Sequence, residues 1–190
     1  TEFTNDETHA VLRWVAQGGR LVLIDRGPDH SLLPQSLHWK VSPVQMDYPA
    51  FNVDPSDTKQ MTERVVALQP VQPTLLTRSV QSVIPSRFAS RIRIDPVPRE
   101  KKEDFDDDEG ASKSSNAPVV HLSDATGGVL VDYIYGSGTI TLLSDPYIVS
   151  NSGIVLADNV QLAINTVAPY QGLIAFDEFH QGRAFTRNAL

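Results

Sequence analysis

The chain of 190 residues contains no cysteine. That absence excludes disulfide bonds, zinc sites built on thiolates, and every mechanism that uses a cysteine nucleophile. It leaves the redox compartment open, because a cysteine-free domain is compatible with oxidising and reducing surroundings alike. Long hydrophobic runs are also absent. No apolar stretch approaches the roughly 20 residues that cross a bilayer, so the chain is not itself a membrane segment.

Basic residues are scarce, with 16 Lys and Arg against 23 Asp and Glu and a formal net charge of −7. This balance argues against nucleic-acid binding, which needs clustered basic side chains. The acidic residues concentrate at 98–118, where the charge-rich and serine-rich composition predicts a flexible acidic loop. The alternative is a metal site, and its ligands would be Asp104, Asp106, Asp107, Asp108 and Glu109. That run lacks the glycine and the terminal glutamate of an EF-hand loop.

The remaining composition, 41% hydrophobic and 21% charged, is that of one globular domain over residues 1–190 with a sizeable core. The first residue is Thr1, and no signal-peptide pattern follows it. We therefore expect the chain to be cut from a longer protein.

The amino-terminal residues predict a helix followed by a buried strand. Thr4 and Glu7 have the spacing of a capping box, and apolar residues including Trp14 and Val15 then recur at helical spacing. Trp14 is expected to pack in the core. After the helix stops at Gly18-Gly19, residues 21–24 form an unbroken apolar run, which is typical of a strand covered on both faces in a parallel sheet.

Later segments predict further elements with less regular patterns. A helix is expected within 56–68, and a strand with one solvated face at 90–95. Two β-rich runs meet at Gly136-Ser137-Gly138, which predicts an antiparallel hairpin. A helix then begins near Asp158 and ends before Pro169, and a final strand is expected at 173–176.

Three sequence blocks together resemble an uncharacterised bacterial family with a domain similar to class I glutamine amidotransferases. The first block includes Glu7, Leu12, Trp14, Val15, Gly18, Gly19 and 21–23. The second includes Tyr135, Gly136, Gly138, Ile140, Ser144, Asp145, Pro146, Asn151, Asp158 and Asn159. The third is formed by Phe176, Asp177, Glu178, His180 and Gly182.

The resemblance implies a layered, flavodoxin-like α/β fold: a mostly parallel sheet that carries an antiparallel hairpin and lacks its first βα unit, which would precede Thr1. It also implies a membrane-anchored bacterial protein, held by segments outside this chain, with the domain on the extracytoplasmic side. Glutamine amidotransferase activity is excluded, because those enzymes use a cysteine nucleophile and this chain has neither cysteine nor a Gly-x-Ser-x-Gly elbow.

Polar residues that follow strand ends are the candidate site, because open α/β sheets bind ligands there. The catalytic candidates are Asp145, Glu178 and His180, and the binding candidates are Asn151 and Asp177. Alternation along an extended chain would turn Glu178 and His180 to one side and Asp177 to the other.

Each of these candidates also has a structural interpretation. Asp145 is expected to cap a turn, and the cluster around His180 to satisfy backbone groups. Ser144 would be a nucleophile only within hydrogen-bond reach of His180.

Two hypotheses follow. The first is a non-catalytic, amidotransferase-like domain that acts in interaction or sensing with an unknown protein partner and needs no cofactor. The second is a hydrolase or metal-dependent enzyme with its site at Asp145, Glu178 and His180. No metal ligand set is predicted, since a catalytic zinc site needs about three protein ligands.

Overall fold

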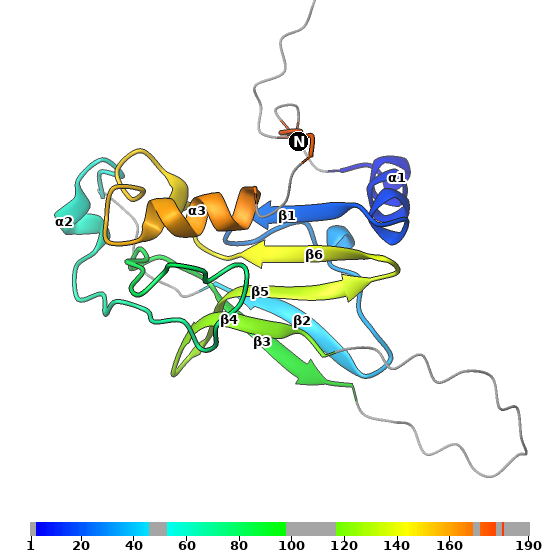
Figure 1. The fold of residues 1–190 in the computed structure, drawn as a ribbon, viewed down its shortest axis with the longest axis horizontal. Coiled ribbons are helices and arrows are strands. Elements are labelled where there is room, and N and C mark those ends of the chain that lie inside the picture. The colour runs from blue at the N-terminus through cyan, green and yellow to red at the C-terminus, as the bar shows by residue number, and fades with distance from the viewer. Residues whose placement is uncertain (1–2, 46–52, 98–116, 169–171, 178–179, 181–190) are drawn as a thin grey trace, which may run out of the picture.

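The computed structural model describes residues 3–45, 53–97, 117–168, 172–177 and 180. They form one six-stranded mixed sheet with a helix toward each end of the strands (Figure 1). The helices are α1 (Asn5–Ala16), α2 (Thr58–Met61) and α3 (Asn159–Val167), with short 3₁₀ turns η1 (His30–Leu32) and η2 (Pro146–Val149). The strands are β1 (Arg20–Ile24), β2 (Trp39–Val44), β3 (Arg91–Pro96), β4 (Val119–Asp124), β5 (Gly127–Tyr135) and β6 (Gly138–Leu143).

The sheet has the strand order β1-β6-β5-β3-β2, and β4 also pairs with β5. Only the β1–β6 pairing is parallel among the described residues, and the other four pairings are antiparallel. The predicted mostly parallel, flavodoxin-like sheet is therefore wrong. The prediction relied on the unbroken apolar run 21–24, which is typical of a central parallel strand. In the structure this run belongs to β1, which lies at the edge of the sheet with all five residues half-buried.

Helix α1 begins at the predicted capping box, in which Thr4 and Glu7 each bond the other's backbone nitrogen. Val15 is fully buried and turns the helix toward the sheet. Trp14 is 53% exposed, so its predicted place in the core is wrong. Its indole instead lies over Gly19, where an added Cβ would come within 2.5 Å of the ring.

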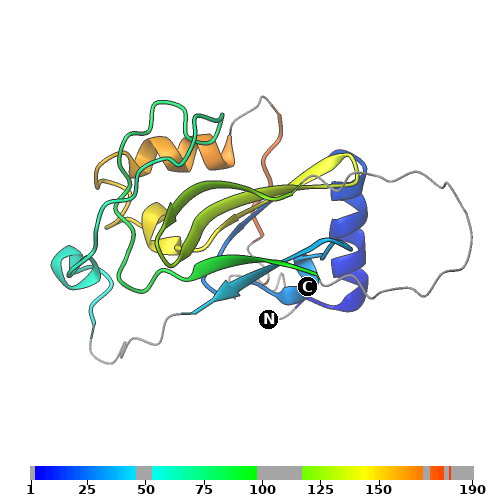
Figure 2. The same ribbon diagram turned by 90° about the horizontal axis from the view of Figure 1, so that it is seen from below.

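The two faces of the sheet carry separate hydrophobic clusters, because successive strand residues point to opposite faces. Val131 and Leu142 belong to the cluster that packs against α1. Their neighbours Leu130 and Leu143 belong to the cluster that contains Leu162 of α3. Figure 2 shows α1 and α3 toward opposite ends of the strands. As a result, α3 covers only part of its face of the sheet.

The uncovered part of that face is polar. Residues two apart on a strand share a face, so Asp132 of β5 and Thr141 of β6 lie on the same face as the buried Leu130 and Leu143. Asp132 and Thr141 are directly paired in the register. Thr139 continues the row toward the hairpin turn. This half-face, bordered by α3 and by the segment that precedes β3, positions the candidate site.

Some of the other sequence predictions are confirmed and some are wrong. The antiparallel hairpin at Gly136-Ser137-Gly138 is confirmed, and Gly136 has a φ of +62° that favours glycine. The strand expected at 90–95 and the helix after Asp158 are also confirmed. The helix expected within 56–68 is limited to the four residues of α2. The final strand is wrong: residues 173–176 lie outside every described strand, and Leu173 is fully exposed.

Candidate functional site

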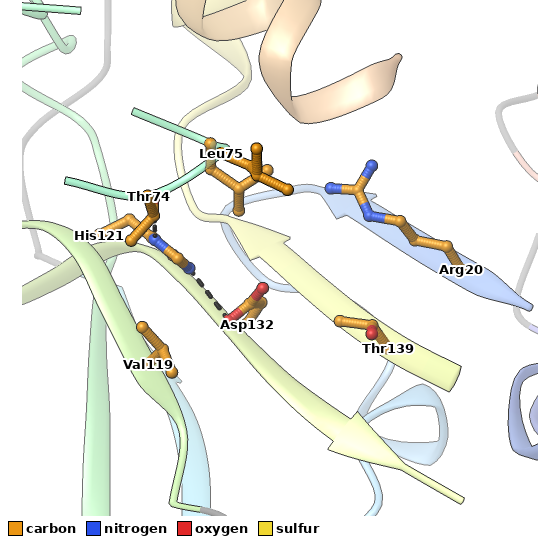
Figure 3. A pocket seen from close by; sticks show the side chains of 8 residues that line it. Arg20, Thr74, Leu75, Val119, His121, Asp132 and Thr139 are labelled. Atoms are coloured by element: carbon orange, nitrogen blue, oxygen red, sulfur yellow. Dashed lines mark hydrogen bonds and ion pairs between the residues drawn. The ribbon is translucent and has the colours of Figure 1, made fainter. Parts of the chain in front are cut away.

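A cavity of about 270 Å³ opens on the polar half-face of the sheet (Figure 3). Five segments of the chain line it: β1, β6, β5, β4 and the loop before β3. Their lining residues are Arg20, Thr139, Asp132, Val119, His121, Thr74, Leu75 and Leu76. The cavity therefore has a polar floor on the strands and an apolar rim that includes Leu75, 53% exposed, and Val119, 37% exposed.

The strand register brings these residues together. Arg20 pairs with Thr139, and Asp132 pairs with both Thr141 and Val119, so all lie on one face. A bulge in β4 at His121 interrupts the register between Val120 and Leu122. Val119 and His121 lie two residues apart and share a face, and the His121 ring points toward Asp132.

The buried imidazole of His121 lies at the centre of a polar row. Its side chain is 3% exposed. Its Nδ1 lies 2.9 Å from Oγ1 of Thr74, and its Nε2 lies 3.0 Å from Oδ1 of Asp132. The second contact has hydrogen-bond length without hydrogen-bond direction, since Nε2 has no directed partner among the described residues.

The hydroxyl groups beyond His121 fix which ring nitrogen donates. The hydroxyl of Thr77 donates to the carbonyl oxygen of Gln72 at 2.9 Å. Its oxygen therefore accepts in the 3.1 Å contact with Thr74, and the hydroxyl of Thr74 is the donor there. Thr74 must then accept from His121, so the proton sits on Nδ1. With Nδ1 protonated, Nε2 presents a lone pair toward Asp132 in the neutral ring and donates to that carboxylate in the charged ring.

The loop over the cavity is held in place by main-chain contacts. The backbone nitrogen of Val71 donates to the carbonyl oxygen of His121 at 2.9 Å, and Gln72 Nε2 donates to that of Val120 at 3.0 Å. From α3, Asn165 Nδ2 donates to the carbonyl oxygens of Leu76 and Arg78 at 3.2 and 2.7 Å. The rim is consequently attached to β4 and to α3, and the cavity is preformed.

Arg20 brings a positive charge to the opposite side of the cavity. From β1 its Nη2 donates to Oγ1 of Thr141 on β6 at 3.3 Å. Thr141 in turn lies directly across from Asp132 in the register. Arg20 on β1 and Asp132 on β5 thus both line the cavity.

The predicted catalytic residue Asp145 lies elsewhere and is 1% exposed. Its carboxylate accepts from the backbone nitrogen and hydroxyl of Ser86 at 2.5 and 2.9 Å, and from the nitrogen of Tyr147 at 3.2 Å. Burial raises the pKa of Asp145, and these hydrogen bonds oppose that rise. Asp145 joins the segment before β3 to the start of η2, as its turn-capping interpretation predicts.

Two other candidates also lie away from the cavity. The hydroxyl of Ser144 is buried and donates to the carbonyl oxygen of Ser90 at 2.8 Å, which is a structural contact. Asn151 is exposed in the turn after η2.

Asp177 and His180 meet near the amino terminus. Oδ2 of Asp177 lies 2.7 Å from Nδ1 of His180, and the ring of Phe3 stacks on the imidazole at a centroid distance of 3.7 Å. Oε2 of Glu7 lies 3.6 Å from Nε2 of His180. The prediction that Asp177 and His180 point to opposite sides of an extended chain is therefore wrong. Glu178 lies outside the described residues.

His180 borders a wider cleft of about 810 Å³, which it shares with Asp25, Asp29 and His30. Asp145 does not line that cleft, so the structure does not bring Asp145 and His180 together. No group of three His, Asp or Glu side chains in the described part of the chain could hold a metal ion. The acidic run proposed as a metal site at 104–109 lies outside the described residues.

Comparison with known proteins gives the family. The sequence pattern of DUF4350, described as a domain of unknown function, matches residues 1–167. This chain belongs to the DUF4350 family. Among curated proteins, none matches it. The DUF4350 chain is similar in fold to a solved structure described as "mmIFT52 N-terminal domain", with a TM-score of 0.50 and 15% sequence identity over 92% of this chain and 75% of that chain.

These findings correct the resemblance drawn from the sequence. The DUF4350 match and the mostly antiparallel sheet replace the flavodoxin-like, amidotransferase-like family. Neither matching description mentions a membrane anchor. Within the described residues of the DUF4350 chain, no helix is long and apolar enough to span a bilayer.

Proposed function

We propose that this DUF4350 domain is a non-catalytic binding domain that senses a small ligand in the cavity beside His121. One observation carries the proposal: a cavity of about 270 Å³ is lined by a buried imidazole whose Nδ1 contacts Thr74 and whose Nε2 lies 3.0 Å from the carboxylate of Asp132. A small ligand in this cavity would lie within reach of the buried polar row of Thr74, His121 and Asp132, which supports binding at this place.

The order of Thr74, His121 and Asp132 resembles a hydrolase triad of hydroxyl, imidazole and carboxylate. The proton positions argue against that reaction. A nucleophilic hydroxyl must give its proton to the imidazole, whereas Thr74 accepts from His121 and donates to Thr77. This arrangement supports binding over hydrolysis.

The expected protein partner stays a prediction. It is supported by apolar side chains on the surface, among them Val160 and Ile164 one helical turn apart on α3, 49% and 54% exposed. A partner that covers this part of α3 would lie close to the loop over the cavity, because Asn165 of α3 holds that loop. Ligand binding and partner binding could then be coupled.

The test is thermal unfolding with four defined probes: acetate, inorganic phosphate, methylammonium and L-leucine. A probe at about ten times its Kd stabilises the folded state by roughly 1.4 kcal/mol. For a domain of this size, that corresponds to a rise in Tm of about 3–6 °C. We expect at least one probe to give this rise.

Two leucine variants locate the effect. Leu75→Trp fills the rim of the cavity and should abolish the rise. Leu37→Trp changes a leucine that is 86% exposed and does not line the cavity, so it should keep the rise. The proposal is wrong if no probe raises Tm, or if the rise persists in Leu75→Trp.

A further inference from the structure

We infer that the protein partner of this domain is a second copy of the same chain, whose α3 packs antiparallel against α3 of the first. This association is independent of ligand binding in the cavity. Three features of α3 support it: an apolar exposed face, a helix without charged residues, and opposite charges beside its two ends.

The outer face of α3 is apolar and exposed. Val160 and Ile164 lie one helical turn apart and are 49% and 54% exposed, whereas Leu162 between them is fully buried. Neither α1 nor α2 lies on the outer side of α3 (Figure 1, Figure 2). Val155, 76% exposed, precedes the helix, and Leu75 belongs to the loop that α3 holds. Clustered apolar surface of this kind marks sites of protein–protein contact.

The helix itself carries no charge. From Asn159 to Val167, α3 contains only apolar and uncharged polar residues. Two copies of this chain each have a formal net charge of −7, and like charges on facing surfaces would oppose association. A face without charged side chains avoids that repulsion in the centre of the contact. Two copies of an acidic chain can therefore approach each other here.

Opposite charges lie beside the two ends of α3. Near the carboxyl end, Asn165 donates to the carbonyl oxygen of the exposed Arg78 at 2.7 Å. At the amino end, the carboxylate of Asp158 accepts from the backbone nitrogens of Gln81 and Ser82 at 2.8 and 3.0 Å. The segment before β3 thus runs along one side of α3, and it places Arg78 and Asp158 on that same side.

An antiparallel pair of helices brings these charges together twice. With the two-fold axis at the level of Leu162, Val160 of each copy faces Ile164 of the other. Residue 158 of one helix is then level with residue 166 of the other, close to where Arg78 lies. A two-fold axis perpendicular to both helices also keeps the flanking segments on the same side. Arg78 of each copy therefore lies beside Asp158 of the other.

Asp158 can accept this guanidinium and keep its own contacts. Gln81 and Ser82 both donate to its Oδ2, and a carboxylate has a second oxygen and about four acceptor sites in all. The helix dipoles favour the same order, since each amino end lies beside a carboxyl end. A parallel pair would instead bring Asp158 beside Asp158 and Arg78 beside Arg78.

Sedimentation equilibrium of the whole chain tests the association. The mean mass should rise from 20.9 kDa toward twice that value as the concentration increases through the micromolar range. Association in this range is expected because the contact lies near the lower end of specific interfaces, about 1,200 Å² in total.

Two alanine variants locate the contact. Ile164→Ala removes three carbon atoms from each side of the contact and should weaken association by at least about 10-fold. Leu37→Ala is the matched control, because it also removes three carbons, from a side chain that is 86% exposed between η1 and β2. It should leave association unchanged, and circular dichroism should show that both variants are folded.

Two charge reversals test the ionic contacts. Arg78→Glu places an acid beside Asp158 of the other copy. Each exposed ion pair contributes modestly and the dimer contains two, so association should weaken by about 2- to 30-fold. Lys40→Glu makes the same change of charge at an exposed position of β2 and should have a smaller effect. Equal effects of the two reversals would contradict the pairing of Arg78 with Asp158.

Single cysteines test the order of the helices, because the chain has no cysteine of its own. In the antiparallel pair, Val160 faces Ile164. An oxidised mixture of Val160→Cys and Ile164→Cys chains should therefore form the mixed disulfide in preference to a disulfide between identical chains. Preference for identical chains would overturn the antiparallel order.

The outcomes separate the dimer from the binding function. A mass of 20.9 kDa at every concentration overturns the dimer and leaves this face to a different protein. Equal association of Ile164→Ala and Leu37→Ala also overturns it. Both results leave ligand binding standing, because the rise in Tm and its loss in Leu75→Trp are measured separately. Absence of any rise in Tm removes the binding function and leaves the dimer standing.

Discussion

Replacing Asp145 with alanine should destabilise the fold strongly, although this residue was a catalytic candidate from the sequence. The carboxylate accepts three hydrogen bonds at 2.5, 2.9 and 3.2 Å from Ser86 and Tyr147, and it is 1% exposed. Alanine would leave two backbone nitrogens and one hydroxyl without this acceptor in a buried place. Each unsatisfied group costs about 1–3 kcal/mol.

Part of this cost is offset, because alanine also removes a carboxyl whose pKa is raised by burial. We therefore expect Asp145→Ala to lower the free energy of unfolding by about 3–4 kcal/mol. Asp145→Asn keeps one acceptor oxygen and should lose about 1–2 kcal/mol. Stabilities of natural domains are about 5–15 kcal/mol, so the alanine variant should still fold and be measurable.

Urea unfolding followed by tryptophan fluorescence measures these differences. Trp39 is 7% exposed and packs edge-to-face on Tyr133 at 5.0 Å, so its emission should report unfolding of the core. Asp25→Ala is the matched control, since Asp25 also follows a strand and accepts from the nitrogen of Gly27, but is exposed. It should lose less than about 1 kcal/mol. A loss below about 1 kcal/mol for Asp145→Ala would refute the structural role of this carboxylate.

Two further predictions concern stability away from the cavity. Burial opposes ionisation of Asp124, but hydrogen bonds from Arg91 and Thr126 outweigh it and lower its pKa from 3.8 to about 2. Its ionised form therefore stabilises the fold above its unfolded pKa, and this contribution of about 1 kcal/mol is lost as pH falls toward 2. In Asp124→Asn, the midpoint of urea unfolding should depend less on pH over that window. An unchanged dependence on pH would contradict this prediction. A Cβ at Gly138 would lie 2.0 Å from the carbonyl oxygen of Val15, so Gly138→Ala should cost about 3 kcal/mol or more in thermal unfolding, whereas Ser137→Ala should cost little.

Local features of the fold could be predicted from the sequence because local chemistry determines them. The capping box at Thr4 and Glu7 and the hairpin at Gly136 depend on residues three or fewer positions apart. The direction of strand pairing could not be predicted in this way. An apolar run such as 21–24 fits a central strand or an edge strand packed against a helix, and the strand order decides between them.

The site was missed for a related reason. His121 lacks any metal-ligand or catalytic spacing in the sequence, and its partner Thr74 lies 47 residues away. The contact forms between strand β4 and the loop before β3, and no local residue pattern or periodicity predicts such a long-range contact. Alternation along an extended chain wrongly separated Asp177 from His180, whose side chains are in contact, and Asp145 forms its own buried contacts away from both.

The most direct test of the account is a two-dimensional ¹H–¹⁵N NMR spectrum of the domain, recorded with and without a mixture of acetate, inorganic phosphate, methylammonium and L-leucine. If the cavity is the binding site, the shifted backbone resonances cluster at Thr74, His121, Asp132 and Thr139. Shifts confined to the cleft beside His180, or an unchanged spectrum, would contradict the account.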